Sequence, residues 1–226
     1  MSIRSANLKQ AVSLAAMALA TGMMPQPMFR NPERDAALRA LAAVAGQRGW
    51  ALSVLRDVAG EEAELLFPGG EIELVEAWSD LCDRDMLALM QDTSEPRLSL
   101  RVREALLLRL PMDDATRRAV ARGVSAQLVG GGQAAFRRGW MRTVNAIWMA
   151  ARDESSGATY LTKRLTLAQV YAATFLYWLA GAPDEAALAA FVDRRLACVR
   201  RLGQARGQIA GRVMGLMGLV RPQAAG

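Results

Sequence analysis

The stretch from Arg48 to Asp80, RGWALSVLRDVAGEEAELLFPGGEIELVEAWSD, sets the interpretation of the rest of the chain. Its first part predicts a short helix that ends at the Gly60 turn, after which a second helix would follow. This is the layout of a helix-turn-helix, whose second helix enters the major groove of DNA. Here the turn is followed by Glu61, Glu62 and Glu64. Three carboxylates would face the phosphates, which is the wrong sign for an affinity that rests largely on cations.

Apart from this charge, the stretch resembles the DNA-reading head of TetR-type repressors. The resemblance implies that later helices line a ligand pocket and form a homodimer. Because the turn is acidic, we interpret the head as a degenerate helix-turn-helix that is retained as a structural cap, and we expect no nucleic-acid partner. The alternative is a TetR-like transcriptional regulator that responds to a hydrophobic ligand.

Length and composition favour one domain. The chain has 226 residues, of which 52% are hydrophobic, and it contains no internal repeat. Its formal net charge is +6 and its pI is near 10.1, with lysine only at Lys9 and Lys163. Such a balance suits nucleic acid, anionic lipid or an acidic protein partner. Cys82 and Cys198 stand in no metal-ligand spacing, so we predict that both are reduced core residues.

The absence of histidine removes much possible chemistry. Ser-His and Cys-His nucleophile pairs, His-bearing zinc sites and Glu-x-x-His di-iron sites are excluded. Asp80, Asp83 and Asp85 remain as possible metal ligands, but we interpret them as a solvated acidic face beside Arg84. The Asp113–Asp114 pair is better explained as a helix N-cap with a first-turn anion. We therefore predict a protein that is not an enzyme, with no catalytic residue, metal or cofactor.

Apolar periodicity predicts helices through nearly all of the chain after residue 33, without strand signals. A first helix runs from about Glu33 to Gly49, a short one covers Leu52 to Val58, and a longer one begins at Gly70. Further helices are predicted at residues 98–110, 113–128, 134–152, 161–180 and 184–202. The glycine triplet at 130–132 is interpreted as a helix-ending turn.

The predicted fold is therefore an all-α, TetR-like bundle of nine or ten helices with a C-terminal amphipathic helix. Residues 1–32 are unassigned, and residues 33–202 form the domain. Within it, residues 33–70 are the head and residues 71–202 the bundle for lipid binding and dimerisation. Residues 203–226 form a membrane-contacting tail.

Two predicted helices carry an unusual apolar load. On residues 134–152, Phe136, Trp140, Val144 and Trp148 share one face, which indicates either a ligand tunnel or, as we favour, ordinary core. Residues 165–182, LTLAQVYAATFLYWLAGA, carry no charge. Their length touches the lower limit for a membrane span, but a central bundle helix produces the same pattern and is favoured.

The two ends of the chain have their own patterns. An apolar stripe flanked by arginines runs through residues 203–226, and glycine recurs at every fourth residue from Gly203 to Gly215. A basic amphipathic helix of this kind lies on anionic membranes, and its glycines make it unstable alone. A frayed end, or a helix packed on the body, is an equal alternative. Near the N-terminus, AVSLAAMALATGMM looks superficially like a secretion signal, although Met23, Met24 or Met28 could be the true start.

Collinear motifs from about Arg34 to Leu202 resemble the COQ-nine family of ubiquinone-biosynthesis accessory proteins. They read RGW, LFPGG, LVEAWSDLCDRDM, RVREALLLRL, WMRTVNAIWMAARD, YLTKRLTLAQVYAATFLYWL and FVDRRL. The resemblance implies a non-catalytic, TetR-like, lipid-binding protein. It would be cytoplasmic, peripherally associated with the inner membrane, and would present isoprenoid quinone intermediates to ring-modifying enzymes, chiefly the di-iron demethoxyubiquinone hydroxylase. Phospholipid is the alternative lipid partner.

The resemblance also implies sites. Lipid contacts are expected at Trp140, Val144, Trp148, Tyr171 and Phe175. The family's partner-facing surface has an acidic residue, Trp-Tyr and a basic residue; here Tyr160 replaces the Trp, Leu161 the Tyr, and Arg164 matches, while Gly157 stands for the acid. Membrane contacts are expected at Val213, Leu216, Met217, Leu219 and Val220.

Overall fold

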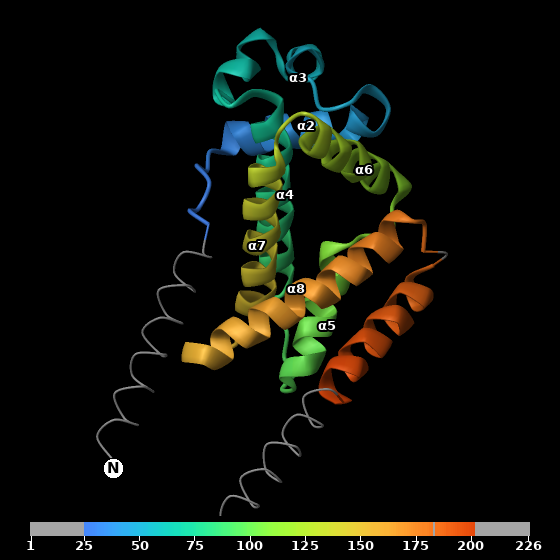
Figure 1. The fold of residues 1–226 in the computed structure, drawn as a ribbon. Coiled ribbons are helices and arrows are strands. Elements are labelled where there is room, and N and C mark those ends of the chain that lie inside the picture. The colour runs from blue at the N-terminus through green and yellow to red at the C-terminus, as the bar shows by residue number, and fades with distance from the viewer. Residues whose placement is uncertain (1–24, 183, 202–226) are drawn as a thin grey trace, which may run out of the picture.

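The computed structural model describes residues 25–182 and 184–201, and every regular element in these ranges is helical (Figure 1). The elements are α2 (Pro32–Arg48), α3 (Leu52–Ala59), the 3₁₀ helix η1 (Glu61–Leu66), α4 (Gly70–Leu89), α5 (Leu98–Arg109), α6 (Asp114–Val129), α7 (Gln133–Ala150), α8 (Gly157–Leu179) and a helix over residues 185–201. The predicted all-α fold is confirmed.

Local capping signals explain where several helices begin and end. The side chain of Asn31 accepts a hydrogen bond from the N–H of Glu33 at 2.8 Å, with Pro32 as the first residue of α2. Asp113 accepts from the N–H of Thr116 at 2.7 Å, so its predicted role as an N-cap is confirmed. Between α6 and α7, Gly131 has a φ of 81°, which makes the predicted glycine turn possible.

The head departs from a working helix-turn-helix. After α3 and the Gly60 turn, the expected second helix is reduced to η1, six residues of 3₁₀ geometry. Glu61 and Glu62 on it are exposed, while Glu64 lies 3.5 Å from Arg56. A 3₁₀ turn of this length presents no continuous helix face to a DNA groove, and its exposed charges are negative.

A buried arginine holds the degenerate head together. Arg34 on α2 donates to the carbonyl of Leu66 at the end of η1 and, at 2.8 Å, to Glu73 on α4. Its guanidinium also lies 4.4 Å from the centre of the Phe67 ring. These contacts fix three elements of the head to one side chain.

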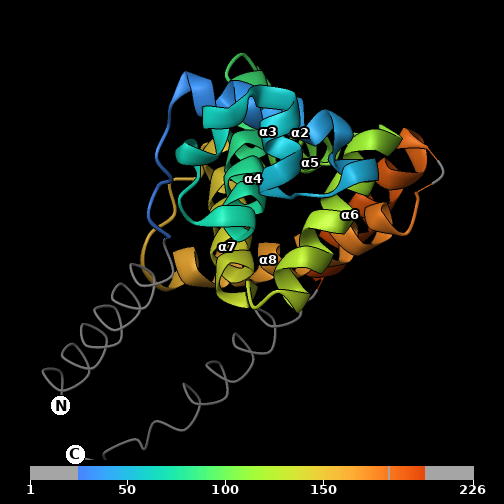
Figure 2. The ribbon, with the colours of Figure 1, turned by 90° about the horizontal axis from the view of Figure 1, so that it is seen from above.

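The apolar interior consists of two clusters that share α4. In the head, α2, α3 and η1 pack on the first half of α4, which contributes Leu74 and Leu81. In the bundle, α5, α7, α8 and the helix over residues 185–201 pack around Met86 and Met90 at the other end of α4. Figures 1 and 2 show α4 running from the head into the bundle beside α7, while α6 covers α2.

The carboxylates of α4 are not a solvated acidic face, which corrects the sequence interpretation. Asp80 is 6% exposed and Asp83 3% exposed, because α5 and α7 pack against this side of α4. Asp80 accepts from Arg84 at 3.0 Å, and the other two aspartates are also held by arginines. Within the described ranges, no three acidic or cysteine side chains are grouped so that they could hold a metal ion.

Two arginines of α7 tie it to α4 through one buried glutamate. Glu76 is 6% exposed and accepts from Arg138 at 2.7 Å and from Arg142. The charge-free stretch of α8 lies in the bundle, where Tyr171, Phe175 and Trp178 are buried. Among the described helices, none has the length and apolarity needed to cross a membrane.

Candidate functional site

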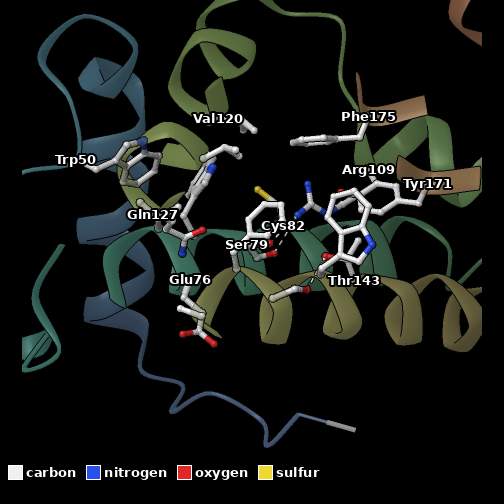
Figure 3. A pocket seen from close by; sticks show the side chains of 17 residues that line it. Trp50, Glu76, Ser79, Cys82, Arg109, Val120, Gln127, Thr143, Tyr171 and Phe175 are labelled. Carbon is white, nitrogen blue, oxygen red and sulfur yellow. Dashed lines mark hydrogen bonds between the residues drawn. The ribbon is translucent and has the colours of Figure 1, made fainter. Parts of the chain in front are cut away.

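A small cavity of about 60 Å³ lies where the head meets the bundle. The head supplies Trp50 to its wall, α4 supplies Trp78, and α5, α6, α7 and α8 close the other sides. In Figure 3, Trp50, Gln127 and Glu76 lie towards one end of the cavity, and Arg109, Tyr171 and Phe175 lie towards the other. The junction between two packed units is a common place for a ligand site.

The bundle end of the cavity is polar and its groups are paired with one another. The Nε of Arg109 donates to Asp83 at 2.7 Å, and its Nη2 donates to the hydroxyl of Ser79 at 3.0 Å. The hydroxyl of Thr143 donates to the second oxygen of Asp83 at 3.1 Å. The carboxylate and the guanidinium therefore balance each other, and neither is free to act as an acid or a base.

Burial perturbs two other groups that line the cavity. It raises the pKa of the Cys82 thiol to about 11, and it raises the pKa of the Tyr171 hydroxyl to about 12. Both groups are therefore neutral near pH 7. A neutral thiol is a poor nucleophile, so the cavity offers shape and hydrogen bonds instead of covalent chemistry.

Trp50 of the head and Trp78 of α4 differ in how their indole N–H groups are used. Trp50 donates to the carbonyl of Ala119 at 2.7 Å. The N–H of Trp78 is buried and has no hydrogen-bond partner among the described residues. The centres of the two rings lie 5.9 Å apart with their planes tilted by 42°, so Trp78 packs against Trp50 while its N–H stays unsatisfied.

Four aromatic side chains from α7 and α8 form a continuous wall, which we call the aromatic wall: Phe136, Trp140, Tyr171 and Phe175. The centre of the Trp140 ring lies 4.4 Å from that of Tyr171, 5.5 Å from that of Phe175 and 5.7 Å from that of Phe136. Tyr171 and Phe175 are 5.8 Å apart. Such a cluster buries a large apolar area and fixes ring orientations.

On the other side of the aromatic wall lies an open groove of about 500 Å³ between α6, α7 and α8. Arg137 is the charged residue of its lining, and the others are apolar, including the exposed Leu128 and Leu176. The groove and the cavity share part of their lining, namely Val124, Phe136, Trp140 and Phe175. The cavity and the groove thus lie on opposite sides of the aromatic wall.

The helices that form the aromatic wall, α7 and α8, lie in a segment that matches a known protein family. A family model described as COQ9 matches residues 134–203. Over this part of its length, the chain is similar to the COQ9 family. The matched part comprises nearly all of α7, together with α8 and the helix over residues 185–201. This match supports an accessory role in ubiquinone biosynthesis. No curated protein matches the chain.

The structure separates the five lipid contacts that the COQ9 resemblance implied. Trp140, Tyr171 and Phe175 come together in the aromatic wall. Val144 and Trp148 are buried in the bundle core and line neither the cavity nor the groove. These two side chains pack α7 against the core of the bundle.

The residues expected to face a partner enzyme lie at the start of α8. Tyr160 and Leu161 are partly exposed, whereas Arg164 is buried and donates to Asn145 of α7 at 2.6 Å. The guanidinium of Arg164 also lies 3.1 Å from the centre of the Tyr160 ring. Arg164 therefore anchors α8 to α7, while Tyr160 and Leu161 remain candidates for a protein contact.

The expected membrane contacts, Val213, Leu216, Met217, Leu219 and Val220, lie outside the described residues, as does the segment 1–24.

Sequence reasoning did not single out Trp78, Ser79 or Arg109 for the cavity. A signal for Arg109 is present, because it follows Val102, Ala105 and Leu106 at the spacing of the buried face of α5. Arginine on the apolar face of a helix points to a buried partner.

Proposed function

We propose that this protein belongs to the COQ9 family and is a non-catalytic lipid-binding protein that takes isoprenoid quinone intermediates, or phospholipid, from the membrane. The groove between α6, α7 and α8 receives the apolar chain, and the aromatic wall supplies the main contacts, with Trp140 and Phe175 facing the groove and Tyr171 facing the cavity. Their contribution is shape and apolar burial.

The observation that supports this proposal is an apolar groove separated from a small cavity by the aromatic wall. At about 500 Å³ the groove falls within the usual range of ligand sites, roughly 300–1,000 Å³, and its lining is almost wholly apolar. The cavity behind it, at about 60 Å³, is too small for a whole lipid. A lipid therefore occupies the groove first and reaches the cavity when the aromatic side chains rotate.

The proposal extends to the membrane and to a partner. The basic amphipathic sequence of residues 203–226 would hold the protein at the cytoplasmic face of the inner membrane, through Val213, Leu216, Met217, Leu219 and Val220. Tyr160 and Leu161 would contact the di-iron demethoxyubiquinone hydroxylase, with Arg164 setting the position of α8. A homodimer would present two such surfaces.

Native mass spectrometry of the purified protein tests lipid binding. Gly139 lines the cavity, and a Cβ built on it meets only Ser79 Oγ, at 3.9 Å. A Gly139→Leu variant should fill the cavity and press on the wall, whereas Gly139→Ala adds one methyl group and serves as its control. We expect a co-purified isoprenoid or phospholipid in wild type and Gly139→Ala, and a reduced amount in Gly139→Leu. Protein that is empty in all three preparations would contradict the proposal.

Quinone profiling of a strain that lacks the protein tests the pathway step. Accumulation of a demethoxy intermediate, reversed by wild type and not by a Tyr160→Ala/Leu161→Ala double variant, is the expected result. Normal ubiquinone in the deletion strain would refute the role. A variant that restores ubiquinone fully would refute the contact with the hydroxylase only.

A transcriptional regulator is the competing function, and the head argues against it. With η1 in place of a recognition helix and exposed glutamates beside it, binding to the upstream DNA should be weak and abolished by moderate salt. A specific, saturable shift at moderate salt would favour the regulator instead.

A further inference from the structure

We propose that the turn between α6 and α7 is a membrane contact in its own right, separate from residues 203–226, and that it places the open groove against an anionic lipid surface. Leu128 and Val129, which we call the α6–α7 tip, insert between the lipids. Arg122 and Arg137 meet the head groups. This inference goes beyond the proposed function, because it requires neither the C-terminal tail nor a lipid in the groove.

The α6–α7 tip carries aliphatic side chains that the fold leaves uncovered. Val129 is 89% exposed, more than any other large hydrophobic side chain in the described ranges, and Leu128 is 45% exposed. Glycines at positions 130–132 follow directly, so the turn contains no larger side chain that could shield them. In Figure 2 this turn lies at the outer edge of the described fold. The two side chains are therefore accessible to an apolar partner.

The tip and the groove form one continuous apolar surface. Leu128 belongs to both, because it also lines the groove. On α8, which lines the same groove, Leu176 is 65% exposed. Single exposed apolar residues are common on proteins, whereas a contiguous exposed apolar surface marks a contact with a membrane or with another protein.

The charges around the tip favour an anionic partner. Between Asp114 and Asp153 the sequence contains seven arginines and no acidic residue. Arg122 and Arg137 are exposed and form no ion pair within the described part of the chain. Arg122 precedes Val129 by seven residues, or about 10 Å along α6. It can therefore reach lipid head groups while the tip lies about 5–10 Å deep, the usual depth of an interfacial apolar face.

A lipid surface fits this pattern better than a protein does. Stable protein interfaces bury about 1,200–2,000 Å² in total and are centred on anchors that fill closed pockets. The tip offers two aliphatic side chains on a narrow turn, which is too little for such an interface. A bilayer requires only exposed apolar side chains with cations beside them, and each cation near an anionic surface strengthens binding about fivefold.

Vesicle binding with matched variants tests the contact. Full-length protein is sedimented with vesicles of phosphatidylcholine alone and with vesicles of phosphatidylcholine mixed with phosphatidylglycerol. The test variant is Leu128→Ser/Val129→Ser. Its control is Leu65→Ser/Leu89→Ser, because these two leucines are 76% and 65% exposed but lie on η1 and at the end of α4.

We expect the tip variant to bind the mixed vesicles about tenfold more weakly than wild type, since two aliphatic side chains no longer leave water. The control should bind like wild type. Arg137→Gln should weaken binding to the mixed vesicles about fivefold and leave binding to phosphatidylcholine alone unchanged. Equal losses for the tip variant and its control would overturn the inference.

A depth measurement keeps the test valid if the tip variant is unstable. Burial raises the pKa of Cys82 to about 11, so in a Cys198→Ser background a nitroxide can be attached selectively at Val129→Cys. On mixed vesicles this label should become more accessible to oxygen and less accessible to a nickel chelate, whereas a label at Leu65→Cys should stay in water.

The outcomes separate the two membrane contacts. If vesicle-bound protein keeps the Val129→Cys label in water, the inference is refuted and the contact through residues 203–226 is left intact; this is also the result expected if a protein partner covers the tip. Wild type that binds neither kind of vesicle would refute both contacts.

Discussion

Arg109 on α5 and Asp83 on α4 form an ion pair of 2.7 Å between side chains that are 8% and 5% exposed. The hydroxyls of Ser79 and Thr143 complete its hydrogen bonds. The pair lies at the bundle end of the cavity and joins two helices that line it. The ion pair therefore holds α4 and α5 together beside the cavity.

Removing one member of this pair should cost more than removing both. We expect Asp83→Ala to lower the free energy of unfolding by about 3–5 kcal/mol, because Arg109 would keep a buried charge without a partner. The double variant Asp83→Leu/Arg109→Met should lose markedly less. Urea denaturation followed by circular dichroism measures both. Equal losses would show that the pair does not act as a coupled unit.

The Asp113 cap should account for part of the stability of α6. Asp113→Ala removes the acceptor for the N–H of Thr116, so we expect a loss of about 1 kcal/mol. Asp114→Ala is the control, since this exposed neighbour pairs with Arg117 at i+3 and should cost less. Thermal unfolding under identical conditions compares them. A larger loss for Asp114→Ala would contradict the assignment of the cap.

Acid stability should depend on the salt bridge between α2 and α4. Hydrogen bonds from Arg84, at 2.6 Å to each oxygen, hold the pKa of the Asp35 carboxyl below its ordinary value, against a smaller opposing effect of burial. A lowered folded-state pKa adds stability that is complete above the unfolded-state value of about 4 and is lost as pH falls through the folded-state pKa.

We therefore expect wild type to lose stability on acidification below about pH 4 more steeply than Asp35→Asn, whose side chain does not titrate. Unfolding free energies between pH 6 and pH 3 give the two slopes. Parallel curves would show that Asp35 gains nothing from Arg84.

The two cysteines should differ in reactivity. Burial raises the pKa of Cys82 to about 11, so roughly one thiol in a thousand is ionised at pH 8, whereas Cys198 is exposed. With iodoacetamide on the native protein, we expect Cys198 to be alkylated first and Cys82 only after unfolding. Peptide mass spectrometry assigns the sites. Rapid alkylation of Cys82 would indicate that the cavity opens readily to water.

Two glycines that flank the cavity should respond to alanine with opposite signs. At Gly123 a Cβ would lie 2.9 Å from Val75 Cγ1 and 3.1 Å from Trp50 Nε1, so Gly123→Ala should destabilise by about 1–3 kcal/mol. At Gly139 the space is open, and Gly139→Ala should stabilise by up to about 1 kcal/mol through helix propensity. Denaturant midpoints of the two variants test this. Stabilisation by Gly123→Ala would mean that α6 and α4 can separate easily.

The predictable parts of this fold are those with local causes. Helix starts at Pro32 and at Asp114 follow from caps, and Gly60 marks the end of α3. Aspartates 80 and 83 were misread, because their burial depends on the packing of α5 and α7 against α4, which spacing within α4 does not reveal.

The start of α8 and the polar end of the cavity likewise could not be predicted from the sequence. The helix α8 begins at Gly157, before the predicted Leu161. The prediction missed this first turn because residues 157–160 show no apolar periodicity. The family resemblance implied Trp140, Tyr171 and Phe175 as lipid contacts, and the fold brings these three side chains together. The polar end joins Ser79 and Arg109 across 30 positions of sequence, and such a pairing arises only from the tertiary fold.

The place of Trp50 and Trp78 in the cavity wall has a consequence for how this chain could have evolved. The head could not be lost without opening the cavity, because Trp50 forms part of the cavity wall. Selection on cargo would preserve Trp50, Val75 and Trp78, the residues that face inwards, while the outer surface of η1 would be free to drift. The head would thus be retained because it forms one wall of the cavity.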